Sequence, residues 1–235
     1  MVGFFILNVL KMQPIFRIIF SAILLTVSVL AQAQDLALKI EHESTSLSAD
    51  GVTRITRFSE RLVRRDHQSW LSRIMPAAAH EEVEPSSGAK NHKHMDVNAA
   101  SRWVVRTSDG KLRVRIVNAQ EKLVVDVAPT DYGNIGFDGR WSTASQLIDP
   151  LQLQRMKVSN REAPVGTRWY EGGSRGQRVM LLWDEKGLYP RRIESVNAQG
   201  SQSSQMVVTR EAMPERLPWV GLASFSQKEY ADLLD

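Results

Sequence analysis

The sequence predicts a mainly β (α+β) protein, built as a curved antiparallel, half-barrel-like sheet with one or two helices on one face. Three observations predict this class. Apolar and polar residues alternate in many short stretches, glycine turns separate these stretches at short intervals, and the strand–helix alternation of a parallel sheet does not occur. Many short strands joined by hairpin turns favour an antiparallel sheet that is curved or partly closed.

A cleaved signal peptide is predicted over residues 1–33. Arg17 precedes an apolar stretch over 18–30, and Ala31-Gln32-Ala33 supplies the small residues of a cleavage site. The apolar stretch is shorter than the roughly 20 residues of a membrane-spanning helix. We therefore expect export to the periplasm, with Met12 as an alternative start codon to Met1.

The mature chain is expected to form a single β-rich domain over residues 34–235. The sequence contains no cysteine, which excludes disulfides, thiolate chemistry and cysteine-based zinc sites. Its net charge is +4, and removal of the signal peptide takes away Lys11 and Arg17 but no acidic residue. A nearly balanced charge in an exported protein argues against a nucleic-acid partner.

The first elements form a hairpin and an extended segment. Residues 36–41 alternate with period two, 48–51 contain an Asp-Gly turn, and 52–58 begin a second strand. Residues 61–76 continue as extended chain and stop at Pro76. A flexible loop is expected over 77–98, because this segment is polar and poor in large apolar residues.

The middle of the chain contains a second hairpin and a helical segment. Residues 101–117 turn at Asp109-Gly110, and residues 122–129 form a further strand that ends at Pro129. Residues 143–157 approximate helical spacing, with a turn or kink at Pro150.

The last third returns to strands. These are predicted over 167–171, 177–196 and 204–211, with turns at Gly187 and Gly200. The glycine-rich stretch over 170–178 lies between strands, so it is a hairpin connection and not a phosphate loop. Ser226 is expected to cap a short C-terminal helix within 225–235.

One segment resembles a known family: "RVMLLWDEKGLYPRRIESVNAQGSQSSQMVVTREAM", residues 178–213. A strand ending in Trp-Asp, a glycine turn, Leu-x-Pro, a strand with Ile-Glu and a last strand with Val-Val are similar to the C-terminal hairpins of the periplasmic lipoprotein-carrier superfamily. That superfamily includes outer-membrane lipoprotein chaperones and periplasmic regulators of envelope stress. "LIDPLQLQRMK" and the long loop over 77–98 do not map onto the carriers.

The resemblance implies an antiparallel half-barrel over a helix, whose apolar face receives an acyl chain or a partner's extended segment. The leading hypothesis is therefore a non-enzymatic periplasmic protein that binds an apolar ligand or docks an envelope protein. Five tryptophans would suit the walls of such a site, or would serve as ordinary core residues. They are Trp70, Trp103, Trp141, Trp169 and Trp183.

The alternative hypothesis is a periplasmic accessory protein that binds copper or zinc through His92 and His94, with His80 as a further ligand. Imidazole suits copper and zinc, and the thioether of Met95 suits cuprous copper. Residues two apart in an extended segment point the same way, so His92 and His94 can face one ion. The polar surroundings also fit a solvated loop.

Other chemistry has weaker support. No serine lies in a G-x-S-x-G turn, and no residue set predicts a catalytic centre. A group of arginines could form a positive face for anionic lipid headgroups, or could be the solvated outer side of strands. The group comprises Arg61, Arg64, Arg65, Arg73, Arg113 and Arg115.

Overall fold

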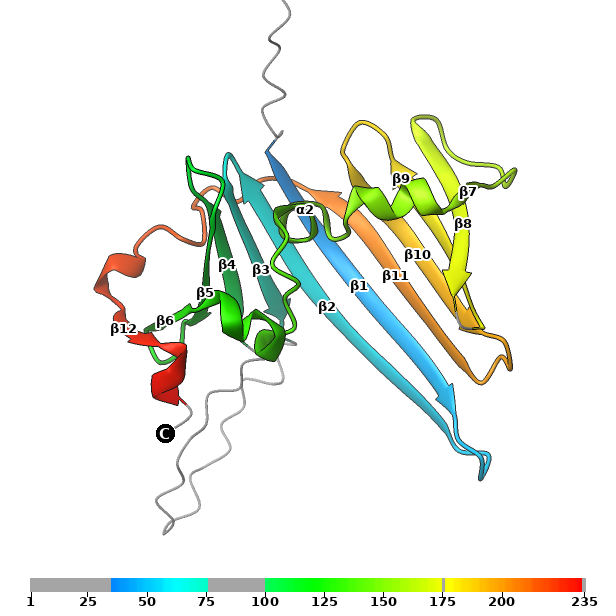
Figure 1. Cartoon of the computed structure of the whole chain (residues 1–235), viewed down its shortest axis with the longest axis horizontal. Coiled ribbons are helices and arrows are strands. Elements are labelled where there is room, and N and C mark those ends of the chain that lie inside the picture. The colour runs from blue at the N-terminus through cyan, green and yellow to red at the C-terminus, as the bar shows by residue number, and fades with distance from the viewer. Residues whose placement is uncertain (1–34, 76–99, 175, 234–235) are drawn as a thin grey trace, which may run out of the picture. The chain divides into compact units, whose positions relative to one another are not determined.

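The structure, a computed structural model, describes residues 35–75, 100–174 and 176–233, which belong to one compact unit. These residues form one open, curved sheet with the strand order β12-β6-β5-β4-β3-β2-β1-β11-β10-β9-β8-β7 (Figure 1). The predicted fold class is therefore confirmed. The predicted signal peptide over 1–33 and loop over 77–98 lie outside the described residues.

The strands are β1 (Leu36–Leu47), β2 (Thr53–Arg65), β3 (Gln68–Ile74), β4 (Ser101–Arg106), β5 (Leu112–Asn118), β6 (Leu123–Val127), β7 (Lys157–Val158), β8 (Thr167–Ser174), β9 (Gln177–Asp184), β10 (Tyr189–Asn197), β11 (Gln202–Glu211) and β12 (Ser226–Glu229). The hairpins predicted around Asp109-Gly110, Gly187 and Gly200 are present as β4–β5, β9–β10 and β10–β11. Alternation of apolar and polar residues therefore located most of the sheet.

The extended segment predicted over 61–76 is in fact two strands. The chain turns at Asp66 and His67, where Asp66 has a φ of 51°, and β3 returns antiparallel to β2. Aspartate tolerates this left-handed conformation better than most residues, so a turn without glycine is accessible here. The missing glycine is the reason that the sequence did not indicate the turn.

The prediction of a C-terminal helix that begins at Ser226 is also wrong for its first residues. Ser226 begins β12, which pairs in parallel with β6, and the chain becomes a short 3-10 helix only at Tyr230–Leu233. The Ser226 hydroxyl and amide both donate to the carbonyl of Lys122 and do not cap a helix. Pairing with the edge of β6 satisfies these backbone groups and buries Tyr230.

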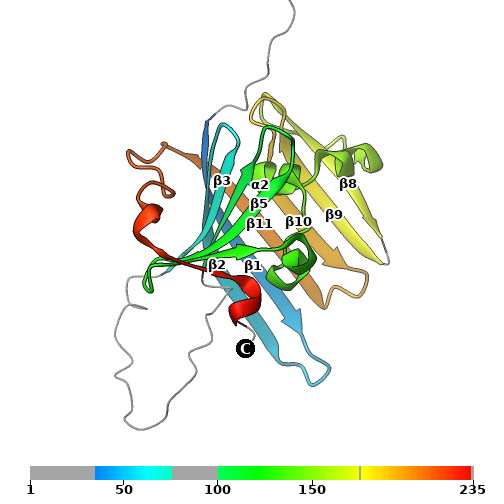
Figure 2. The same cartoon turned by 60° about the vertical axis from the view of Figure 1, so that its left-hand side comes forward.

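A helical segment crosses one side of the sheet, which we call the inner face (Figure 2). The side chains of Leu38, Leu62 and Val104 belong to the apolar clusters of this face. The helical segment comprises η3 (Pro129–Ile135), α2 (Trp141–Gln146) and η4 (Pro150–Arg155), with the expected break at Pro150. Two side chains of the sheet hold α2 by its carbonyls. Arg64 Nη1 donates to Ser145 O at 2.7 Å, and Ser69 Oγ donates to Ala144 O at 2.5 Å.

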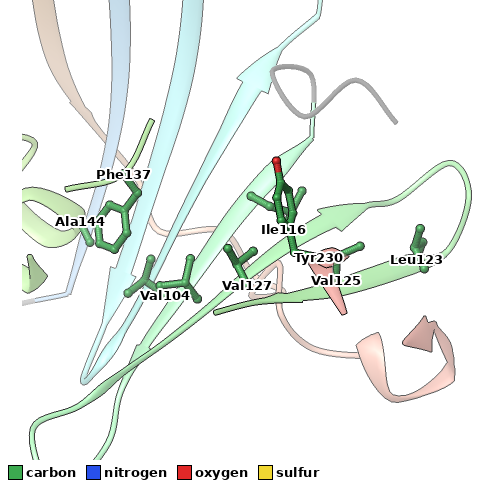
Figure 3. Packing of buried hydrophobic residues seen from close by; sticks show 9 residues of the cluster. Val104, Ile116, Leu123, Val125, Val127, Phe137, Ala144 and Tyr230 are labelled. Carbon is green, nitrogen blue, oxygen red and sulfur yellow. The ribbon is translucent and has the colours of Figure 1, made fainter. Parts of the chain in front are cut away.

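The inner face carries two apolar clusters under this segment. One joins β4, β5 and β6 to Phe137 and Ala144, and includes Tyr230 near Ile116 and Val125 (Figure 3). The other lies on β1, β2 and β11, where Leu147 packs against a buried cluster that includes Leu38 and Leu62. The helical segment therefore covers the N-terminal end of β1 and the strands that pair with it there.

The opposite side, the outer face, has its own cover over β2 to β6. Val63, Trp70, Val117 and Val124 are buried beneath the C-terminal segment that contains Leu222. Trp103, Met213, Leu217, Trp219 and Phe225 pack around this cluster. The β2–β6 part of the sheet is thus covered on both faces, whereas the far ends of β1 and β2 are not buried by these clusters.

Candidate functional site: an apolar row on the inner face

A continuous row of side chains crosses six strands of the inner face, from β2 to β8. The strand register pairs each member directly with the next, so all of them point to the same side of the sheet. At about 4.8 Å between neighbouring strands, the row is roughly 24 Å long. Its members, in order, are Phe58, His42, Met206, Ile193, Leu181 and Tyr170.

The row lies just beyond the part of the inner face that the helical segment covers. One step nearer to α2, Ile40 and Val208 are buried in the core. In the row itself four side chains remain partly exposed: Phe58, His42, Met206 and Ile193. A groove of about 260 Å³ opens at this point, lined mainly by apolar surface of Phe58, Ile193 and Met206 together with His42, Ser44 and Ser204.

The opposite border of the row is polar. One step further from α2, the inner positions of β1, β11 and β10 are Ser44, Ser204 and Ser195. A second groove, of about 620 Å³, continues from these serines toward the β8–β9 and β10–β11 turns. The inner face therefore changes from buried apolar through half-open apolar to polar along the strands. Such an arrangement suits a ligand that is itself apolar with polar edges.

Charged groups gather at the Phe58 end of the row. The His42 ring stacks on the Phe58 ring with centroids 4.3 Å apart, and the Arg73 guanidinium lies 3.8 Å from the Phe58 centroid. His42 Nε2 lies 2.9 Å from Glu60 Oε2, with the two side chains 25% and 24% exposed. Because β2 lies between β1 and β3, Phe58 lies between the histidine and the arginine.

A second arginine stands beside this group. Arg102 on β4 is paired with Leu71, which makes it a diagonal neighbour of Arg73 on the inner face. Its guanidinium lies 5.0 Å from the Phe137 ring, and burial lowers its pKa despite the nearby carboxylates of Glu60 and Asp138. Within the described parts of the chain, neither Arg73 nor Arg102 forms an ion pair.

The outer face of the same strands has different chemistry, because its charges are neutralised in pairs. Arg57 bonds Glu43, and Arg61 bonds Glu211, each at 2.8 Å. Arg113 and Arg115 share Asp126. The arginines predicted to form one positive face are thus divided: Arg64 and Arg73 point inward, whereas the outer face carries Arg61, Arg65, Arg113 and Arg115.

The tryptophans are mostly core residues. Trp70 and Trp103 belong to the outer-face cluster, and Trp169 is buried with Arg161 stacked 3.9 Å from its ring. Trp141 packs at the start of α2, and Trp183 is 4% exposed. None of the five lines the groove beside Phe58.

The predicted metal ligands cannot be placed. His80, His92 and His94 lie outside the described residues. Within the residues that are described, no three histidine or acidic side chains gather as a metal site would require. The copper or zinc hypothesis stays a prediction.

Sequence reasoning missed His42, Phe58 and Arg102 at this end of the row, and named Arg73 only within the larger arginine group. A signal existed for His42, since it continues the period-two series of Leu36, Leu38 and Ile40. Whether Arg73 points inward depends on the turn at Asp66 and His67, because this turn decides which residues of β3 pair with which residues of β2.

Among the described residues, no helix has the length and apolar character needed to cross a membrane.

No protein-family model matches the chain, and no curated protein matches it either. Solved structures of low similarity include an uncharacterized conserved protein from Thermus thermophilus, at 8% identity and a TM-score of 0.39 over 83% of this chain and 90% of that one. They also include a LolA superfamily protein from Nitrosomonas europaea, at 9% identity and a TM-score of 0.30 over 79% and 88%.

MucB appears in the same comparison. In the complex of Pseudomonas aeruginosa MucA and MucB, the likeness has 14% identity and a TM-score of 0.32 over 79% of this chain and 55% of that one, so the chain spans about half of it. LolA superfamily proteins and MucB are thus among the solved structures found, at this low similarity. At these scores the likeness carries no argument.

Proposed function

We propose that this chain is a non-enzymatic periplasmic protein that holds an acyl chain on the inner face of its sheet. The observation that supports this most directly is the part of the row from Phe58 to Ile193, in which side chains of four adjacent strands lie in register along a half-open, mainly apolar groove. Burial of this row by a ligand would remove apolar surface from water, at about 25 cal/mol per Å².

The alternative occupant of the row is the extended segment of an envelope protein. A strand-like peptide binds most readily by adding to a sheet edge, where its backbone can form hydrogen bonds. The row instead lies across the middle of the sheet, where β1, β11 and β10 already pair on both sides. The occupant must therefore bind through apolar contact, which favours an acyl chain.

Substitution of Met206 by Gln tests the proposal. Met206 lies in the row, whereas its neighbour Val207 points to the outer face, so Val207→Gln is a matched control in the same strand. We expect Met206→Gln to weaken binding of a fluorescent acyl probe by about tenfold, because about 1.4 kcal/mol of apolar contact is lost. Val207→Gln should change it by less than about twofold, which is roughly 0.4 kcal/mol.

Native mass spectrometry of the protein purified from the periplasm supplies the second readout. A co-purifying acyl species that is depleted in Met206→Gln supports the proposal. Equal losses in both variants, with both melting like the unaltered protein, would contradict it. So would absence of acyl binding in a protein that retains a peptide partner on the same face.

A further inference from the structure

We infer that the site selects an amphiphile with an anionic headgroup, a carboxylate or phosphate, which Arg73 and Arg102 bind at the Phe58 end of the row. This inference rests on the proposed function and adds to it the chemical class of the ligand and its direction in the groove. The acyl chain runs from Phe58 toward Ile193, along the groove, and the headgroup lies over β3 and β4.

The two guanidinium groups lie at the Phe58 end of the row. Arg73 lies on Phe58, the last aromatic member of the row, at 3.8 Å from its centroid. Arg102 lies diagonally beyond it on the next strand. A chain that followed the row would therefore leave its first polar atoms beside both arginines. Arginine donates in a planar fork that matches carboxylate and phosphate oxygens.

The two nearby carboxylates bond other groups and not these arginines. Glu60 is directly opposite Arg73 in the strand register, yet its carboxylate is directed to His42, 2.9 Å away. Asp138 accepts from the Thr143 hydroxyl at 2.7 Å and from the Arg140 amide at 3.0 Å. Both carboxylates lower the positive potential at the site without forming an ion pair with either guanidinium.

Several arginines on the outer face of the sheet, in contrast, are ion-paired. On the outer face Arg57, Arg61 and Arg113 each bond a carboxylate within 2.8 Å. Arg73 and Arg102, however, have only an aromatic ring as their described partner. Both arginines are partly buried. An arginine held against a ring keeps its donors available to an anion, and a low local dielectric strengthens that contact.

The experiment compares dodecanoate and dodecyl phosphate, each below its micellar concentration, with neutral dodecanol below its solubility limit, by displacement of a fluorescent acyl probe from the purified chain. Arg73→Gln should weaken both anionic ligands by about tenfold or more, since one charge-assisted contact is lost. Dodecanol binding should change by less than about twofold, a difference of roughly 0.4 kcal/mol.

Arg57→Gln is the matched control, because Arg57 belongs to β2 but lies ion-paired on the outer face. It should alter none of the affinities. Acetate and inorganic phosphate, tested alone, distinguish a headgroup site from a site for a free anion. We expect neither to displace the probe.

The outcomes separate the two claims. If dodecanol and the anionic ligands bind equally and Arg73→Gln affects them alike, the headgroup inference fails while the proposed function stands. Displacement by acetate or phosphate alone would also overturn the inference. If no acyl ligand binds at all, the proposed function fails. Arg102→Gln, checked for folding by circular dichroism, should reproduce the selective loss.

Discussion

At the scale of single residues, Asp126 shows how one carboxylate joins two strands. It lies on β6 and accepts hydrogen bonds from Arg113 Nε at 2.8 Å and Arg115 Nε at 3.1 Å, both on β5. Arg115 also lies 4.4 Å from the ring of Trp103 on β4. The group therefore connects three adjacent strands on the outer face. Burial alone would raise the pKa of Asp126, but the two arginines outweigh it and hold the pKa below 3.8.

This lowered pKa predicts how stability depends on pH. A carboxylate whose folded-state pKa lies below its unfolded value stabilises the fold above the unfolded pKa, and the contribution is lost as pH falls through the folded value. Asp126→Asn should lower the free energy of unfolding by about 1 kcal/mol at pH 7. Urea denaturation over a pH series should show this difference shrinking below pH 3.8. A difference that stays constant at all pH values would exclude the mechanism.

At the scale of elements, the β9–β10 turn is organised by Asp184. Its carboxylate accepts from the Lys186 amide at 3.1 Å, the Gly187 amide at 2.6 Å and Arg191 Nε at 2.8 Å. The sequence predicted a turn at Gly187, and the structure adds the reason for the glycine. A Cβ atom there would lie 2.4 Å from Cε1 of Tyr189, which is buried.

Gly187→Ala is therefore expected to destabilise the protein by about 1–3 kcal/mol, because the added methyl group forces Tyr189 or the turn to move. Gly133→Ala is the control, since a Cβ at that position meets nothing within 4 Å. Thermal unfolding of both variants checks the prediction. A Gly187→Ala protein as stable as the Gly133→Ala protein would show that Tyr189 relocates without cost.

Prediction from sequence succeeded where the signal was local. Alternation placed Leu36, Leu38 and Ile40 in the core, and the same period includes His42. It failed at Ser226, where a serine before a polar stretch is typical of a helix cap. Pairing with β6, more than 100 residues away in the chain, decided the conformation instead. A non-local backbone ladder of this kind leaves no pattern within the segment itself.

At the scale of the molecule, the two faces of the sheet are covered differently. Leu222 and its neighbours cover the outer face of β2 to β6, while the apolar row lies on the inner face. The outer cover therefore contributes to stability without reaching the groove beside Phe58.

Leu222→Ala separates these roles. It should lower the free energy of unfolding by about 2–3 kcal/mol, because a buried side chain is truncated and leaves a cavity. Binding of the acyl probe should be unchanged at temperatures where the variant is folded. Calorimetry and probe titration together test this. Loss of binding in a folded variant would mean that the two faces are coupled.

The sequence by itself determined the fold class, the position of most strands and which residues of each strand share a face, because all three follow from a period of two and from local turns. Only the tertiary structure decided that β1 lies between β2 and β11, which brings His42, Phe58 and Met206 into one row. It also placed Arg73 and Arg102 at the end of that row. Strand order depends on the burial and hydrogen bonding of the whole sheet, and no single segment contains that information.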